Sequence, residues 1–270
     1  MELGVLIMMN SDIDAGFKKV KEMGFSSCQL NCWDETLYTD EMAQKVNEAA
    51  KKYDVKISSF WCGWKGPAVW NFYDGPHTLG LVPVEYRYER IRELMRGSDF
   101  VKKIGVENIV THVGFLPENP STSEYCSLVN SLRELANYVK NNGQYFLFET
   151  GQETPVTLKR MIEDIGTGNL GINLDPANLI LYGKANPIDA LDVFGEYVRD
   201  VHAKDGKYPT DGKELGVETP IGEGKVNFPE FVKKLKEVGY NGPLTIEREI
   251  SGEQQIKDIV ASKKYLEELI

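Results

Sequence analysis

The chain has no hydrophobic run long enough for a membrane helix and no paired-cysteine framework. None of its 270 residues belongs to a stretch approaching the ~20 consecutive apolar residues that a membrane span needs. Its cysteines, Cys28, Cys32, Cys62 and Cys126, form no CxxC pair. Residues 1–14 carry neither the basic region nor the small-residue cleavage site of a signal peptide. We therefore expect a cytoplasmic protein with free thiols that does not bind membranes.

Positive charge and nucleotide-binding motifs are also scarce. Lys and Arg number 31 against 41 Asp and Glu, which gives a net charge of −10. This balance argues against binding to nucleic acid or to an anionic membrane through bulk electrostatics. No GxGxxG or GxxxxGK[ST] motif follows a predicted strand. An open, doubly wound nucleotide-binding sheet is therefore disfavoured.

Short apolar runs alternate with amphipathic helical patterns along almost the whole chain. Most runs are continuous rather than alternating, as in parallel strands that are buried on both faces. Strands are predicted at residues 3–9, 27–33, 55–62, 108–113, 145–150, 170–175, 198–203 and 244–247. Helices are predicted at residues 12–23, 40–53, 85–104, 123–141, 155–165, 228–238 and 253–269. Because no composition break divides the pattern, we predict an α/β fold, a single (β/α)8 TIM barrel over residues 1–270.

Two connections, at residues 63–84 and 206–226, are much longer than the others. Both follow predicted strands, so both should lie on the face of the barrel where active sites form. Loops of this length in a compact domain are often functional lids. The first carries Trp64, Trp70 and His77. An aromatic lid over a polar ligand and packing against the barrel rim or a second subunit are both consistent with this composition.

Acidic or imidazole side chains stand at the ends of the last four predicted strands, at Glu149, Asp175, His202 and Glu247. The first three follow one another at intervals of one strand–helix unit. Each alone has an ordinary explanation, such as a solvated strand-end acid, a turn residue or a hydrogen-bonded histidine. Together they predict a site for one divalent metal ion, because carboxylates gathered at a barrel mouth need a cationic partner.

Three carboxylates and one imidazole make a ligand set that consists mostly of oxygen. Such a set favours Mn²⁺ or Mg²⁺ and tolerates Zn²⁺ or Co²⁺. A structural zinc site would instead use cysteines in close pairs. Four protein ligands would leave two positions open on a six-coordinate metal ion. Two neighbouring oxygens of a sugar could fill those positions.

Five segments carry a family resemblance: FLFETGQETP, INLDPANLI, VHAKDGK, PIGEGKVNFPEF and LTIERE. Through them the chain resembles the sugar-phosphate isomerase/epimerase family of the xylose-isomerase-like TIM barrel superfamily. The resemblance implies that the four strand-end residues hold the metal ion and that Glu149 and Glu247 are also catalytic. It implies an isomerase or epimerase for a sugar, sugar phosphate or ketose. One glutamate would remove a proton beside the carbonyl and the other would return one, through a metal-stabilised enediolate.

One position departs from the family pattern. Asn178 stands three residues after Asp175, where several characterised epimerases have histidine. Asparagine can hydrogen-bond a hydroxyl group but cannot titrate like imidazole, which argues against a ketose 3-epimerase. A dehydratase or lyase for a keto-sugar or an inositol-derived ketone is therefore the alternative, and a non-catalytic carbohydrate-binding barrel is the third. The multi-zinc endonucleases of the superfamily need more than the three histidines present.

Further residues are predicted to contact substrate or support the metal ligands. They are His112, Glu153, Asn178, Lys204 and Trp64. His112 could equally be a hydrogen-bonded strand residue, Glu153 could cap a helix, and Lys204 could pair with Asp205. The expected partner is a small-molecule carbohydrate, and assembly into a homo-oligomer is possible. The choice of catalytic base, the metal and the phosphorylation of the substrate stay open.

Overall fold

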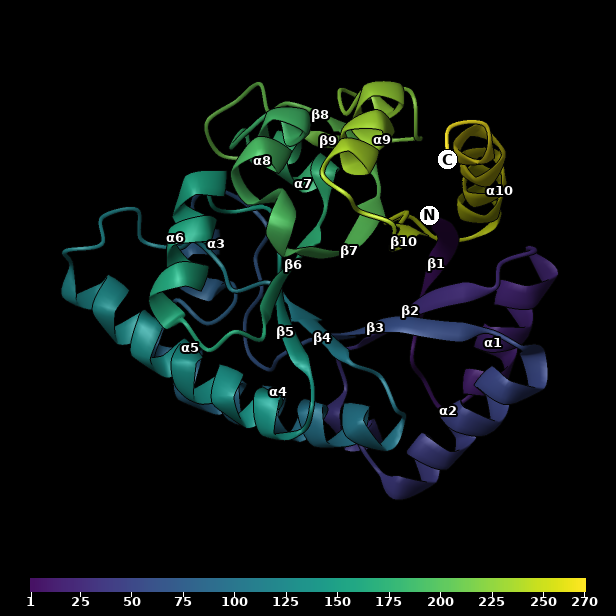
Figure 1. The fold of residues 1–270 in the computed structure, drawn as a ribbon, viewed down its shortest axis with the longest axis horizontal. Helices are drawn as coiled ribbons and strands as arrows, with labels where there is room; N and C mark the ends of the chain where they lie inside the picture. The colour runs from purple at the N-terminus through teal and green to yellow at the C-terminus, as the bar shows by residue number, and fades with distance from the viewer.

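The described residues, 1–270 of a computed structural model, form a closed barrel of eight parallel strands with helices around it (Figure 1). The (β/α)8 prediction is confirmed. In barrel order the strands are β1 (Glu2–Met8), β2 (Ser27–Cys32), β3 (Lys56–Cys62), β4 (Asn108–Thr111), β5 (Tyr145–Glu149), β6 (Leu170–Leu174), β7 (Val198–Ala203) and β10 (Pro243–Ile246). The barrel closes where β1 pairs with β10, for example at Leu3 and Leu244. All five residues of β6 are buried, which explains its continuous apolar pattern.

Seven helices lie within a few residues of their predicted positions. They are α1 (Ile13–Glu22), α2 (Asp40–Tyr53), α4 (Val84–Lys103), α5 (Ser123–Asn141), α6 (Pro155–Ile165), α9 (Phe228–Glu237) and α10 (Glu253–Glu267). Their ends follow capping chemistry: the Thr122 side chain accepts a hydrogen bond from the N–H of Tyr125, and Gly166 ends α6 in the left-handed conformation. No helix of the structure is both long and apolar enough to cross a membrane.

Two helices between β6 and β7 were not predicted, α7 (Pro176–Leu181) and α8 (Pro187–Phe194). All six residues of α7 are buried. A helix that is enclosed on every side shows no amphipathic pattern, so its sequence does not reveal it. This short helix begins directly after Asp175 and therefore lies at the barrel mouth.

The two long connections meet over the mouth of the barrel. The first contains a short helix, α3 (Gly75–Thr78), and the second contains a hairpin of β8 (Asp205–Lys207) and β9 (Val217–Thr219). An isolated antiparallel bridge joins Asn71 to Glu214 across the two loops. Each loop therefore holds the other in place above the strand ends.

Arg90, in α4, holds the first of these loops by hydrogen bonds to its backbone. Its side chain is 1% exposed, and its guanidinium donates to the carbonyl oxygens of Lys65 (3.1 Å), Pro67 (2.9 Å), Thr78 (2.8 Å) and Gly80 (2.7 Å). Burial lowers the pKa of Arg90 to about 10, so the group stays charged at neutral pH. A single cation thus satisfies four loop carbonyls.

Replacing Arg90 by methionine should lower the free energy of unfolding by about 3 kcal/mol, because the carbonyls lose their donors while the apolar stem is kept. Urea denaturation measures this. Arg92→Met is the matched control, since Arg92 lies on the exposed face of the same helix. Equal destabilisation by the two substitutions would contradict this role of Arg90.

Candidate metal centre

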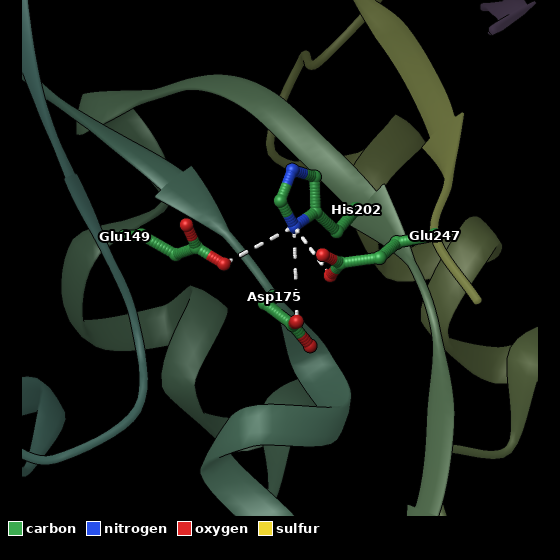
Figure 2. Close-up of side chains that lie close together, drawn as sticks. All are labelled: Glu149, Asp175, His202 and Glu247. Atoms are coloured by element: carbon green, nitrogen blue, oxygen red, sulfur yellow. Dashed lines mark ion pairs between the residues drawn. The ribbon is translucent and has the colours of Figure 1, made fainter. Parts of the chain in front are cut away.

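Glu149, Asp175, His202 and Glu247 lie together at the carboxyl end of the barrel (Figure 2). One ligand atom from each residue lies within 4.8 Å of the others. Glu149 ends β5, Asp175 follows β6, His202 lies in β7 and Glu247 follows β10. These four strands are consecutive neighbours in the barrel, so their ends meet on one arc of its rim.

The Nδ1 atom of His202 lies at the centre of this cluster. It is 3.3 Å from Glu149 Oε1, 3.7 Å from Asp175 Oδ2 and 3.1 Å from Glu247 Oε2. Figure 2 shows Glu149 and Glu247 approaching it from opposite sides. The Nδ1 atom, Asp175 Oδ2 and Glu247 Oε2 are buried and form no hydrogen bond within the chain, although Lys204 lies near both oxygens as an ion-pair partner. Buried nitrogen and oxygen atoms that face one point and lack hydrogen bonds fit a divalent cation.

Neighbouring residues fix which atoms face that point. His202 Nε2 lies 2.8 Å from Gln29 Oε1, and donation of an N–H there leaves Nδ1 as the nitrogen that faces the centre. Asp175 Oδ1 accepts from the backbone N–H of Asn178 at 2.9 Å, so Oδ2 is the oxygen that faces the centre. The hydroxyl of Thr150 bonds the Asp175 backbone at 2.8 Å. Sequence reasoning missed Gln29, because it reaches the site across the barrel from β2.

Opposite charges, rather than burial, set the ionisation of the cluster. Burial raises the pKa of Glu247, but Lys204 and His202 outweigh it and hold the pKa well below its usual value. At Glu149, likewise, His112 and His202 outweigh burial and lower the pKa. Burial lowers the pKa of His202, but Glu247 and Glu149 raise it well above its usual value. Without a metal ion, the imidazolium of His202 is therefore the cation that these carboxylates surround.

Lys204 is a second cation held by the cluster. Its side chain is 2% exposed, and its Nζ lies 3.5 Å from Asp175 Oδ2, 3.2 Å from Glu247 Oε2 and 3.1 Å from Glu249 Oε1. It also donates to Asn178 Oδ1 at 3.4 Å. The structure therefore places Lys204 among the candidate ligands rather than against Asp205.

A pocket of about 380 Å³ opens onto the centre and is lined by Glu149 and Glu247. Among the other predicted site residues, His112 and Asn178 also line it. His112 Nε2 lies 3.5 Å from Glu149 Oε1, and the indole N–H of Trp61 donates to the other oxygen of Glu149. The pocket thus presents both glutamates to any bound molecule, with Glu149 held by two aromatic neighbours.

Aromatic rings form a further wall of the pocket. Trp33, Trp61, Trp70 and Tyr182 line it. Trp64, a predicted site residue, is not among the lining residues and packs behind this wall, 5.2 Å from Trp33 and 5.8 Å from Trp61 between ring centroids. Trp33 directly follows β2, so its place at a strand end was a signal that sequence reasoning did not use.

A family model described as a xylose isomerase-like TIM barrel matches residues 17–269. The chain belongs to this family. A solved xylose isomerase domain protein from Planctomyces limnophilus is 34% identical, with a TM-score of 0.94, over 99% of this chain and 96% of that one. A D-tagatose 3-epimerase-like protein shares the fold, at 24% identity and a TM-score of 0.75 over 100% and 97% of the two chains. An inosose dehydratase of Geobacillus kaustophilus is 28% identical over 145 residues, 47% of this chain and 46% of that protein.

In this xylose isomerase-like barrel, Glu153 lies apart from the pocket lining. Its side chain is buried, and its Oε1 has no hydrogen-bond partner. Burial raises the pKa of Glu153 from 4.5 to about 8. The folded protein therefore holds a proton here at neutral pH that the unfolded chain releases. This group stabilises the fold most below pH 4.5, and its contribution is lost as the pH rises through about 8.

Glu153→Gln should remove this pH dependence. We compare the free energy of unfolding of the variant with that of the parent at each pH. The variant's advantage should be about 3 kcal/mol larger at pH 9 than at pH 5, because glutamine cannot ionise. Urea denaturation at the two pH values measures the difference. Glu124→Gln, at an exposed position in α5, is the control and should change little. An equal gain at both pH values would count against a proton held by Glu153.

Proposed function

We propose that this barrel is a metal-dependent isomerase or epimerase that acts on a small carbohydrate with a carbonyl group. The observation that carries the proposal is the position of Glu149 and Glu247. They lie on opposite sides of one candidate metal site and both line one pocket. Two carboxylates on opposite faces can remove a proton from one side of a carbon and return one from the other. A cytoplasmic location and a homo-oligomeric state remain predictions.

A bound divalent cation, held by Glu149, Asp175, His202 and Glu247, would polarise the substrate carbonyl and make the adjacent C–H acidic. The chain's own residues would move the proton. Both glutamates have lowered pKa values, so both are ionised and can act as bases at neutral pH. The indole N–H of Trp61 orients the Glu149 carboxylate, and Lys204 orients that of Glu247.

The remaining pocket residues would hold the substrate. The aromatic wall offers apolar surface to the C–H groups of a carbohydrate and excludes water from the reacting carbon. Asn178 lines the pocket next to Lys204 and offers an amide for a substrate hydroxyl. Return of the proton to the same carbon inverts it, which is epimerisation. Return to the neighbouring carbon moves the carbonyl, which is isomerisation.

A dehydratase is the second candidate. It is favoured by Asn178, which replaces a titratable histidine, and by the partial match to an inosose dehydratase. The first proton removal would be the same, but a hydroxyl on the next carbon would then leave as water. Loss of a hydroxyl needs a proton donor, and His112 lines the pocket beside Glu149.

Proton exchange in heavy water tests both candidates. The protein, loaded with Mn²⁺, Mg²⁺, Co²⁺ or Zn²⁺, is incubated with ketoses and inositol-derived ketones. An isomerase or epimerase should place deuterium on a substrate carbon without loss of water from the substrate, as measured by NMR and mass spectrometry. A dehydratase should release one water per substrate. If no compound exchanges a C–H or loses water with any of the metals, both candidates fail and a carbohydrate-binding barrel is left.

A further inference from the structure

The charges around the pocket bear on the class of substrate. We propose that the pocket accepts an uncharged polyhydroxy ketone and discriminates against phosphorylated or carboxylated ones. The inference rests on the proposed function, because it names the substrate class of the same site. Four features of the structure support it: the charge of the pocket lining, the enclosure of Lys204, the backbone N–H groups after β7, and the aromatic wall.

The charged side chains that line the pocket are all acidic. They are Glu149, Glu247 and Glu249, and no lysine or arginine lines it. Glu249 lies at the mouth, with 58% of its side chain exposed. With Glu249, the site holds four carboxylates, which exceed the three positive charges of Lys204 and a divalent cation. A phosphate or carboxylate entering the pocket would therefore meet negative charge that is screened little by water.

Lys204 is the nearest cation, and it is not available to an anionic substrate. It does not line the pocket, and its Nζ already contacts Asp175, Glu247 and Glu249. If Lys204 turned toward a substrate phosphate, buried carboxylates would lose their partner, and an unpaired buried charge is strongly unfavourable. The lysine therefore balances the chain's own acids.

Backbone N–H groups after β7 could bind an anion, but a carboxylate of the chain already occupies them. In many TIM barrels the loops after the last two strands bind a substrate phosphate through backbone N–H groups. Here four such groups converge on the buried carboxylate of Asp205. Its Oδ1 accepts from Gly206 (2.8 Å) and Val226 (3.1 Å), and its Oδ2 accepts from Gly222 (3.0 Å) and Gly224 (3.1 Å). No free N–H of this group is left for a phosphate.

The aromatic wall favours the same class of substrate. Trp33, Trp61 and Trp70 present ring surface to the pocket. Rings of this kind pack well against the C–H face of a neutral carbohydrate. The face of such a ring would remove water from a charged group without offering it a hydrogen bond in return, which is costly. The polar contacts available are the amides of Asn31 and Asn178, the imidazole of His112 and the metal site, all of which suit hydroxyl and carbonyl oxygens.

A matched pair of compounds tests the proposal on the metal-loaded, full-length protein. D-fructose is compared with D-fructose 6-phosphate, and an inositol-derived ketone with its phosphate ester. Quenching of the pocket tryptophans reports binding, and deuterium incorporation reports proton exchange. We expect at least tenfold tighter binding or faster exchange for the uncharged member of a pair. Equal or better performance of the phosphate esters overturns the proposal, as does failure of every uncharged ketone to bind.

The two readouts separate this inference from the proposed function. Binding of an uncharged ketone without exchange of any C–H would reject the isomerase or epimerase while supporting the substrate class. Exchange with a phosphate ester in preference to its parent would keep the proposed function and overturn the substrate class.

One substitution tests whether the charge at the mouth is responsible. Glu249→Gln removes a carboxylate beside Lys204 at a half-exposed position without changing the shape of the side chain. At pH 8.5, where Glu249 is ionised, we expect the preference for uncharged over phosphorylated ketones to fall severalfold. Glu253→Gln removes the same charge at the start of α10, where the side chain is 93% exposed, and should leave the preference unchanged. An unchanged preference in Glu249→Gln would overturn the role of this carboxylate.

Discussion

Replacement of Glu149 or Glu247 by glutamine should lower the interconversion of substrate and product by about 10³-fold or more. Glutamine keeps the size of the side chain but cannot accept a proton. Each carboxylate lies on its own side of the centre, so each variant loses the base on one face only. Both variants should therefore lose interconversion even though one base remains.

Deuterium exchange makes this prediction sharper for an epimerase. The remaining glutamate can still remove and return a proton on its own face. Glu149→Gln should therefore keep exchange with one epimer, and Glu247→Gln should keep exchange with the other. Elemental analysis must show that both variants still hold metal, since each residue is also a candidate ligand. Glu153→Gln, outside the pocket, is the control for a lost carboxyl group. Interconversion within tenfold of the parent in either variant would reject the two-base assignment.

Removal of the metal ion by a chelator should abolish turnover and lower the stability of the fold. A cation that binds only the folded chain adds about 4 kcal/mol at a concentration 1,000 times its dissociation constant. Thermal unfolding with and without Mn²⁺ measures this gain. If the chelator leaves turnover unchanged, the four-residue cluster has a structural role only.

The affinity for metal should also rise with pH. The carboxylates raise the pKa of His202 well above its usual value, so the metal-free folded protein carries an imidazolium at neutral pH. That charge stabilises the metal-free fold below the unfolded pKa, and its contribution is lost as the pH rises through the folded pKa. Metal must displace this proton, so the apparent affinity should rise by about tenfold per pH unit below that pKa.

Calorimetric titration in buffers of different ionisation enthalpy counts the protons released. We expect one proton per metal ion near neutral pH for the parent. His77→Gln, at an exposed position in the first long loop, should behave in the same way. His202→Gln should bind metal weakly and lose the proton release. Metal binding to the parent without proton release would contradict the ionisation state inferred for His202.

Much of the architecture could be predicted because it depends on local pattern. Strands buried on both faces give continuous apolar runs, and helices on the barrel surface give amphipathic ones. The helices α3, α7 and α8 were missed, and of these α7 is buried on every side and shows no such pattern. The second long loop was predicted as irregular because β8 and β9 have three residues each, too few for a periodic signal.

The candidate metal ligands could be proposed from sequence for a related reason. A carboxylate or imidazole at the end of an apolar strand marks the same end of every strand in a parallel barrel. Residue type and spacing therefore suffice to bring Glu149, Asp175, His202 and Glu247 to one rim. Their role as ligands remains a prediction, but the structure gathers them within 4.8 Å.

The sequence by itself determined the barrel, its family and the rim on which four candidate metal ligands gather, because strand periodicity and chain order are local properties. Only the tertiary structure decided how that rim is completed. Gln29 hydrogen-bonds His202 from across the barrel, Trp61 donates to Glu149, and Asp205 accepts from the backbone N–H groups of its own loop. Such pairings depend on barrel closure and on the pleat of each strand, because these decide which polar groups are buried together. Polar groups that are buried together must then form hydrogen bonds with one another.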